Sequence, residues 1–336
     1  MNFNSFSRAQ FTLDSETVSQ YFGARLQDQP HPDTPAVAAI FSADDVLRYD
    51  QQSLADARAS VDAVVGLQTK AKQVAEVRDI SLFNGETSVW GRVYHPCPGT
   101  ILPIIVYFHG GGWTIGSVQA ADRPCRRIAV SAEAVVVSVE YRLAPEHPFP
   151  LPYEDCLSAT QSIAAHASSI GGDVNRLFVM GDSAGANLAA AVAHTLADSS
   201  EINIAGQILL YPCLLPSGRG DFDSYVQNAA GPILSAKEMS WFWDMYLSKP
   251  EDGHDSRASP YLAKNFAAMP PSKIVVAEMD ILRDEGLAYA ERLREAGVPV
   301  DVTLFHGAPH GFYWLDGVLS QATELDAVIA DWVKQV

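Results

Sequence analysis

The sequence is poor in cysteine and in positive charge. Lysine and arginine number 23 against 40 aspartates and glutamates, which gives a net charge of −17. A chain this acidic repels phosphate backbones and anionic membranes, so we expect no nucleic-acid partner. No cysteine belongs to a C-x-x-C pair or stands near a histidine at zinc-ligand spacing, which argues against a metal site. We expect buried free thiols in a reducing compartment at Cys97, Cys125, Cys156 and Cys213.

Signals for secretion and for membrane insertion are also missing. The opening stretch MNFNSFSRAQFTLDS has neither a basic region nor an apolar region, so it predicts no secretion signal. No apolar run approaches the roughly 18 residues that a membrane span requires. Repeats, low-complexity tracts and charge blocks are absent as well. We therefore expect a cytoplasmic protein.

Short apolar runs alternate with helical patterns from about residue 70 onward. Runs such as PIIVYFH and AVVVSVEY are nearly continuous in apolarity, as in strands buried on both faces. This alternation predicts an α/β fold with a mostly parallel eight-stranded sheet and helices on both faces. The tight NGET turn between the first two strands predicts an antiparallel hairpin. The predicted strands are 77–83, 88–95, 103–109, 134–141, 176–182, 205–212, 273–280 and 299–306, and the predicted helices are 123–132, 153–167, 183–197, 283–297 and 321–336.

Two regions do not fit this alternation. Residues 1–70 are helical in pattern, and residues 212–260 form a long insertion between the sixth and seventh strands. An insertion of that length is expected to carry function or a subdomain. We therefore predict N-terminal cap helices in 1–70, a cap insertion in 212–260, and a catalytic core formed by 71–211 and 261–336.

The motif GDSAGAN at 181–187 stands where a predicted strand ends and an Ala-rich helix begins. A G-x-S-x-G pattern in this context is typical of a nucleophile elbow, a sharp turn that exposes the serine above the sheet. The helix that follows points its amino end, with its free N–H groups, at the reaction centre. Ser183 is therefore the candidate nucleophile.

A serine nucleophile needs a base, and in this context the base is expected downstream. His194 lies inside the helix after the elbow and favours a packing role, while His254 falls in a polar loop. His306 and His310 both follow the last strand, so either could reach the site. We favour His310, because it lies on a glycine-flanked loop beyond the strand.

The acid that orients the base is expected just past the preceding strand. Asp280 stands directly at that strand's end, whereas Glu278 lies deeper and Asp284 begins the next helix, where capping explains it. Asp182 adjoins the serine and is interpreted as a loop brace. Asp280 is the candidate acid.

Three consecutive glycines follow the third strand in the segment HGGGW at 109–113. Glycines let backbone amides approach a ligand without a Cβ in the way, and an HGGG loop at this strand is typical of the oxyanion hole of lipases and esterases. We expect the amides of Gly111, Gly112 and Ala184 to be the donors, with His109 as a brace.

These residues resemble the hormone-sensitive-lipase-like branch of the α/β-hydrolases, including the bacterial family IV carboxylesterases. The resemblance rests, in family order, on HGGGW, YRLAPEHPFP, GDSAGANLA, the Asp280 segment and HGF at 310–312. It implies an α/β-hydrolase fold, a Ser183–His310–Asp280 triad, the same three oxyanion donors and a helical cap built from the two irregular regions. A homodimer is expected from this resemblance only. One departure is Ile281, where the family often has proline.

The predicted reaction is hydrolysis of short- to medium-chain acyl esters through an acyl-enzyme on Ser183, without metal or cofactor. The alternatives are hydrolysis of a lactone, carbamate or peptide bond, and non-catalytic ligand binding on the same fold. Trp113 beside the oxyanion loop is a pocket candidate. The aromatic cluster at 241–246, with Trp241 and Tyr246 as substrate-binding candidates, fits either a pocket wall or a packed amphipathic helix.

Overall fold

The computed structural model describes residues 32–41, 47–84, 87–197, 199, 201–216 and 222–336. Its centre is an eight-stranded sheet in the order β1-β2-β4-β3-β5-β6-β7-β8. Strand β2 runs antiparallel to both β1 and β4, and every other neighbouring pair is parallel. The strands are β1 Glu76–Asn84, β2 Thr87–His95, β3 Leu102–Phe108, β4 Val135–Glu140, β5 Gly172–Asp182, β6 Gly206–Leu210, β7 Ser272–Met279 and β8 Val300–Pro309.

The central strands are almost entirely apolar, as expected of strands covered on both faces. All of β3 from Pro103 to Phe108 and all of β4 from Val135 to Val139 is buried. At the edge the pattern changes: Leu82 of β1 is 2% exposed and the neighbouring Phe83 is 59% exposed. Alternation of this kind is expected of a strand with one free face. The predicted α/β sheet and its initial antiparallel hairpin are both confirmed.

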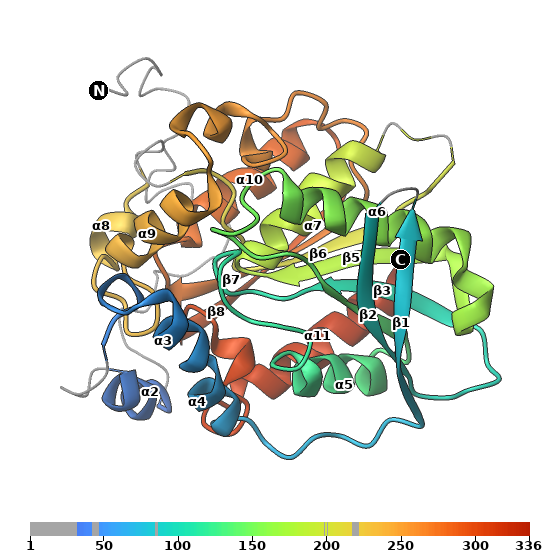
Figure 1. Cartoon of the computed structure of the whole chain (residues 1–336), viewed down its shortest axis with the longest axis horizontal. Coiled ribbons are helices and arrows are strands. Elements are labelled where there is room, and N and C mark those ends of the chain that lie inside the picture. The colour runs from blue at the N-terminus through green and yellow to red at the C-terminus, as the bar shows by residue number, and fades with distance from the viewer. Residues whose placement is uncertain (1–31, 42–46, 85–86, 198, 200, 217–221) are drawn as a thin grey trace.

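Helices cover both faces of the sheet (Figure 1). Helices α5 and α11 pack together on one face, and α6, α7 and α10 lie on the other. Each begins within two residues of a predicted helix, so all five predicted helices are confirmed. Their bounds are α5 Asp122–Ser131, α6 Leu151–Ala165, α7 Ala184–Leu196, α10 Arg283–Glu295 and α11 Gln321–Gln335.

The N-terminal region and the insertion contribute short helices at one end of the molecule (Figure 1). The two pieces are bonded to each other: the Tyr49 amide donates to Glu238 Oε1 at 3.0 Å, and Arg48 donates to the carbonyls of Gly231 and Pro232 at 2.6 and 3.0 Å. The division into cap and core remains a prediction, and residues 1–31, 42–46 and 217–221 lie outside the described residues. The helices are α2 Thr34–Phe41, η2 Tyr49–Gln51, α3 Leu54–Ala59, α4 Val61–Gly66, α8 Ser224–Gln227, α9 Ala236–Tyr246, η4 Pro250–His254 and η5 Pro260–Leu262.

A buried arginine on α5 joins the C-terminal elements to the core. Arg127 is 3% exposed and pairs with Asp316 at 2.9 Å and with Asp326 of α11 at 3.0 Å. It also donates to the carbonyl of Tyr313, whose hydroxyl donates to Asp326 at 2.7 Å. The chain that leaves β8 through η6 Phe312–Trp314 is therefore held by charge-assisted hydrogen bonds.

Two further predictions concern the cysteines and the membrane. Cys125, Cys156 and Cys213 are buried and free, as predicted, but Cys97 is exposed, so the expectation of burial is wrong there. Cys97 follows the end of β2 in a surface turn, where no element covers it. No helix among the described residues is long and apolar enough to cross a bilayer.

Candidate active site

Ser183 forms a one-residue turn between a strand and a helix. Strand β5 ends at Asp182 and α7 begins at Ala184, so Ser183 alone makes the change of direction. Its φ of 54° and ψ of −120° lie outside the regions that side-chain-bearing residues normally adopt. The Ser183 amide donates to the carbonyl of Leu210 at the end of β6, at 2.9 Å. The turn predicted from GDSAGAN is thus present, and it is strained.

The two glycines of the motif are required by the packing around this turn. A Cβ on Gly181 would lie 2.3 Å from the backbone of Gly185, and a Cβ on Gly185 would lie 2.0 Å from the carbonyl oxygen of Phe108 in β3. No larger residue fits at either position unless backbone moves. The motif spacing therefore reflects the close approach of α7 to the ends of β3 and β5.

His310 and Asp280 complete a continuous chain of hydrogen bonds from the serine. Asp280 Oδ2 lies 2.7 Å from His310 Nδ1, and His310 Nε2 lies 2.9 Å from Ser183 Oγ. Because a carboxylate can only accept, Nδ1 carries the proton and Nε2 accepts from the serine hydroxyl. The amide of Leu282 donates to the other oxygen, Asp280 Oδ1, at 2.9 Å, which fixes the carboxylate's orientation. All three side chains are less than 10% exposed.

The alternative bases have other partners. His306 points its Nδ1 toward Glu278 Oε2 at 3.4 Å, and the same oxygen accepts from the Gly307 amide at 2.6 Å. His194 faces the hydroxyl of Tyr289 at 2.9 Å, and burial lowers its pKa to about 4. These residues are not brought to Ser183.

Three more residues that the motifs singled out also lie apart from the serine hydroxyl. Asp284 stands in the first turn of α10, accepts from the Ser224 amide at 2.8 Å and pairs with Arg283. His254 ends η4 and is exposed. His109 is buried, contacts the Gly110 carbonyl through Nδ1 at 2.7 Å, and has its pKa lowered by burial to about 4.

The glycine loop after β3 packs closely against its surroundings. Gly111 and Gly112 have φ values of 113° and 57°, which glycine adopts without strain. Asp182 accepts from the Gly110 amide at 2.9 Å, as expected of a brace. Burial raises the pKa of Asp182 to about 6. Gly111, Gly112 and Ser183 line one cavity, and Ala184 is the first residue of α7.

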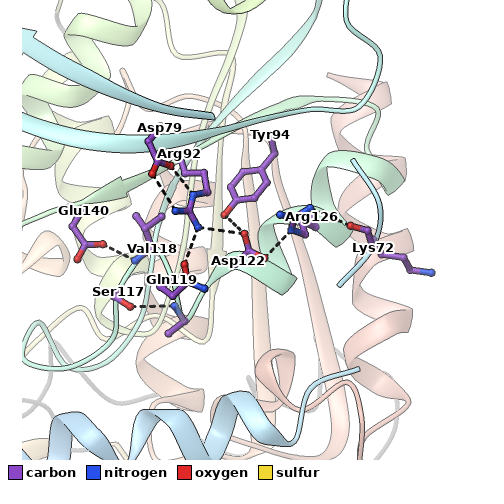
Figure 2. A network of polar contacts seen from close by, with 11 residues as sticks. Lys72, Asp79, Arg92, Tyr94, Ser117, Val118, Gln119, Asp122, Arg126 and Glu140 are labelled. Atoms are coloured by element: carbon purple, nitrogen blue, oxygen red, sulfur yellow. Dashed lines mark hydrogen bonds and ion pairs between the residues drawn. The ribbon is translucent and has the colours of Figure 1, made fainter. Parts of the chain in front are cut away.

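A polar network fixes the chain that leads from this loop into α5 (Figure 2). Glu140 at the end of β4 accepts from the Val118 amide at 2.6 Å. Arg92 of β2 pairs with Asp79 of β1 at 2.7 Å, lies 3.5 Å from Asp122 at the start of α5, and donates to Gln119. The far end of the segment is thus tied to three strands.

The cavity in front of Ser183 is small and mostly apolar. Its volume is about 110 Å³. The N-terminal region and the insertion both supply walls, and of their wall residues the sequence patterns indicated only Phe242, as a member of the 241–246 aromatic cluster. For the others the only signal was an apolar side chain in one of the two irregular regions. These wall residues are Tyr49, Val61 and Val64 from the first region and Ile233, Leu234, Met239 and Phe242 from the second.

The pocket candidates Trp113, Trp241 and Tyr246 do not line this cavity. Trp113 is fully buried, and its ring stacks on Tyr246 with centroids 4.2 Å apart. Trp241 packs edge-on against Phe242 at 5.0 Å. The backbone of Trp113 explains its placement: its positive φ of 58° turns the indole ring away from the cavity and into the core. The aromatic cluster of α9 is thus mainly packed, and Phe242 is its member in the cavity wall.

The sheet order, the strand-to-helix serine turn and the glycine loop after β3 together define an α/β-hydrolase fold. Comparison with known proteins agrees. The sequence profile of the alpha/beta hydrolase fold matches residues 105–314, and the chain belongs to this family.

Individual relatives give the same answer. The chain is 40% identical over 253 residues to the esterase LipI of Mycobacterium tuberculosis, covering 74% of this chain and 78% of LipI. It is 34% identical over 248 residues to an ethyl acetate hydrolase of Pseudomonas putida, covering 73% and 77%. A hyperthermophilic esterase from Pyrobaculum calidifontis superposes with a TM-score of 0.85 at 36% identity, over 91% of this chain and 99% of that one. The predicted resemblance to hormone-sensitive-lipase-like carboxylesterases is confirmed.

Proposed function

We propose that this protein is a serine carboxylesterase that hydrolyses small, uncharged esters through an acyl-enzyme on Ser183. The observation that carries the proposal is the unbroken hydrogen-bond chain from Ser183 through His310 to Asp280, at 2.9 and 2.7 Å, at the wall of an apolar cavity. The relatives described above bear esterase names, which supports the same reaction class.

In the first half-reaction, His310 Nε2 takes the hydroxyl proton while Ser183 Oγ attacks the ester carbonyl carbon. The carbonyl oxygen gains the negative charge. It is stabilised by the amides of Gly111, Gly112 and Ala184, of which Ala184 also contributes the amino end of α7. The His310 imidazolium then protonates the leaving alcohol.

In the second half-reaction, water takes the alcohol's place. His310 removes a proton from the water, which attacks the acyl carbon, and the regenerated imidazolium returns a proton to Ser183 Oγ as the acid leaves. Asp280 remains ionised and stabilises the imidazolium in both halves. Apart from the ester and water, the proposed cycle uses only side chains and amides of this chain.

The cavity supports the substrate class. Besides Asp182 and His310, its wall residues carry no ionisable carboxyl, amino or guanidinium group. Charged acyl or alcohol groups would lose their hydration there without a partner. Its volume of about 110 Å³ favours short acyl chains over long ones. The cap formed by the N-terminal region and the insertion belongs to the same proposal, since both regions line the cavity.

The test is turnover of nitrophenyl esters from acetate to decanoate. We expect a rate maximum at short to medium chains and a loss of at least about 10⁴-fold in Ser183→Ala, with the exposed Ser169→Ala as control. Retained turnover in Ser183→Ala would contradict the nucleophile. No ester turnover would favour the alternatives, which lactone, carbamate and peptide substrates and ligand-binding assays then separate. The homodimer and the cytoplasmic location carried over from the sequence are tested by sedimentation and by cell fractionation.

A further inference from the structure

The proposed oxyanion loop combines close packing with a soft backbone. A Cβ on Gly110 would lie 2.3 Å from Asp182, one on Gly111 would lie 2.2 Å from the Ile115 carbonyl oxygen, and one on Gly112 would lie 2.1 Å from the Phe242 ring. The sequence cannot stiffen this loop with side chains, because none fits. Glycine loses more conformational freedom on ordering than any other residue. The loop must therefore be held from outside.

Thr114 provides the nearest support. Its amide donates to the Gly111 carbonyl at 3.0 Å, and its hydroxyl donates to the Gly112 carbonyl at 2.9 Å. Thr114 is fully buried. The Gly111 carbonyl shares its peptide plane with the Gly112 N–H, and the Gly112 carbonyl shares its plane with the Trp113 N–H. The direction of the Gly112 amide therefore depends on where Thr114 lies.

Thr114 is in turn held by an arginine from the N-terminal region. Arg58 of α3 donates through Nε to the Thr114 carbonyl at 3.0 Å and through Nη2 to the Ala144 carbonyl at 3.1 Å. The Ala144 amide donates to the Trp113 carbonyl at 2.9 Å, so both branches lead back to the glycine turn. Glu146 accepts from both terminal nitrogens of Arg58, at 2.8 and 2.6 Å, in the bidentate geometry that fixes a guanidinium plane.

We propose that Arg58 is a positioning residue that holds the glycine turn, and with it the Gly112 oxyanion donor, in its catalytic orientation. The inference rests on the ester hydrolysis proposed above. It gives the N-terminal region a role in the chemistry as well as in the cavity wall. The segment from Gly110 to Val118 is also anchored at its two ends. Asp182 binds the Gly110 amide, and Glu140 binds the Val118 amide (Figure 2). Arg58 binds the middle of the segment, at the Thr114 carbonyl.

A purely structural role for Arg58 predicts a different outcome. If the arginine only fastens α3 to the core, its loss would loosen the cavity wall formed by Val61 and Val64 and raise KM. If it positions the Gly112 amide, its loss would weaken only the binding of the oxyanion and lower kcat. The bond to Arg58 lowers the pKa of the Glu146 carboxyl to about 2, so the pair stays charged at every assay pH.

The experiment compares Arg58→Met with Arg78→Met in the full-length protein. Arg78 is a matched control on β1, because it also pairs with a glutamate, Glu76 at 2.6 Å, and caps one carbonyl, that of Ser169 at 3.1 Å. We expect Arg58→Met to lower kcat by on the order of 10- to 100-fold, with KM within about twofold. Arg78→Met should leave both constants unchanged.

A second measurement reads the oxyanion hole directly. A trifluoromethyl ketone adds to the serine as a tetrahedral anion, so its affinity should fall in Arg58→Met by the same factor as kcat/KM, while the affinity for the acid product stays unchanged. Unchanged kcat, or a rise in KM alone, would overturn the proposal.

Two gentler variants guard against loss of folding. Glu146→Gln keeps the shape but frees the guanidinium, and a three- to tenfold loss of kcat is expected with an unchanged Tm. The kcat of Arg58→Lys should lie between those of wild type and Arg58→Met, because a lysine cannot donate to both carbonyls in one plane. Wild-type protein that hydrolyses no ester would refute the proposed function. Wild-type activity that needs Ser183 but survives Arg58→Met would refute this inference alone.

Discussion

Replacing Asp280 with asparagine tests the proposed triad, because it changes which nitrogen of His310 carries the ring proton. The carboxylate is held at both oxygens, with Oδ1 facing the Leu282 amide at 2.9 Å and Oδ2 facing His310 Nδ1 at 2.7 Å. In Asp280→Asn the amide oxygen is expected to stay on the Leu282 N–H, which turns the side-chain NH₂ toward His310. Nδ1 must then accept, so the ring proton moves to Nε2, and the base can no longer take the proton of Ser183.

The expected loss of activity follows from the free energy needed to return the His310 proton from Nε2 to Nδ1. Flipping the amide would restore the tautomer but leave the buried Leu282 N–H unpaired, at about 1–3 kcal/mol. The neutral amide also no longer stabilises the imidazolium, and the loss of an opposite charge at hydrogen-bond distance costs about 1.4–4 kcal/mol. The sum of roughly 2–7 kcal/mol corresponds to a loss of about 30- to 10⁵-fold. This range includes the roughly 10⁴-fold loss that the same change causes in serine protease triads.

The assay is kcat/KM on the best nitrophenyl ester, with Glu278→Gln as matched control. Glu278 is also a buried carboxylate on the same strand end, but it binds the Gly307 amide instead of His310. The kcat/KM of Glu278→Gln should fall by less than about tenfold. A loss below about threefold in Asp280→Asn, or equal losses in the two variants, would refute the assignment of Asp280.

The remaining predictions concern the glycine loop and two buried charges. Gly112→Ala should lower kcat by at least about 100-fold, because its methyl group would lie 2.1 Å from the Phe242 ring; Gly112→Ala with Phe242→Ala should regain part of the rate, and no gain would argue against a steric cause. Burial raises the pKa of Asp182 from 3.8 to about 6, so its contribution to stability is present below pH ~4 and is lost as the pH rises through ~6, by about 3 kcal/mol in all. Urea unfolding across this range should show that decline in wild type but not in Asp182→Asn, and parallel curves would contradict it. Arg127→Met should lower the free energy of unfolding by about 3–5 kcal/mol because two buried carboxylates lose their partner, and a change below about 1 kcal/mol in urea melts would contradict this.

The features that could be predicted from the sequence are those that local backbone chemistry dictates. The strands of the core are apolar because they are covered on both faces, and the elbow glycines are needed where α7 meets β3. The order of the serine, acid and base segments along the chain matches the order of the parallel strands. Such signals occupy a few adjacent residues, so a single sequence contains them.

Most of the cavity wall was not predictable in the same way, although the 241–246 cluster that contains Phe242 was a candidate. Tyr49 and Phe242 lie far apart in the sequence, yet their rings meet 5.5 Å apart beside the serine. Trp113 illustrates the reverse case. It directly follows Gly112 in the sequence and was therefore a pocket candidate, but its backbone turns the indole into the core. Arg58 belongs to no motif, and its importance depends on the carbonyls that tertiary packing brings to it. Contacts of this kind are set by the whole fold.

The strained turn at Ser183 has a consequence for how the protein can evolve. A serine held at a φ of 54° costs about 1–3 kcal/mol relative to an unstrained backbone, and glycine would relieve most of that cost. Selection for stability alone would therefore remove the nucleophile and give a sturdier, inert protein. The proposed role of Ser183 as nucleophile therefore implies that selection for turnover, and not for stability, keeps the hydroxyl at this position.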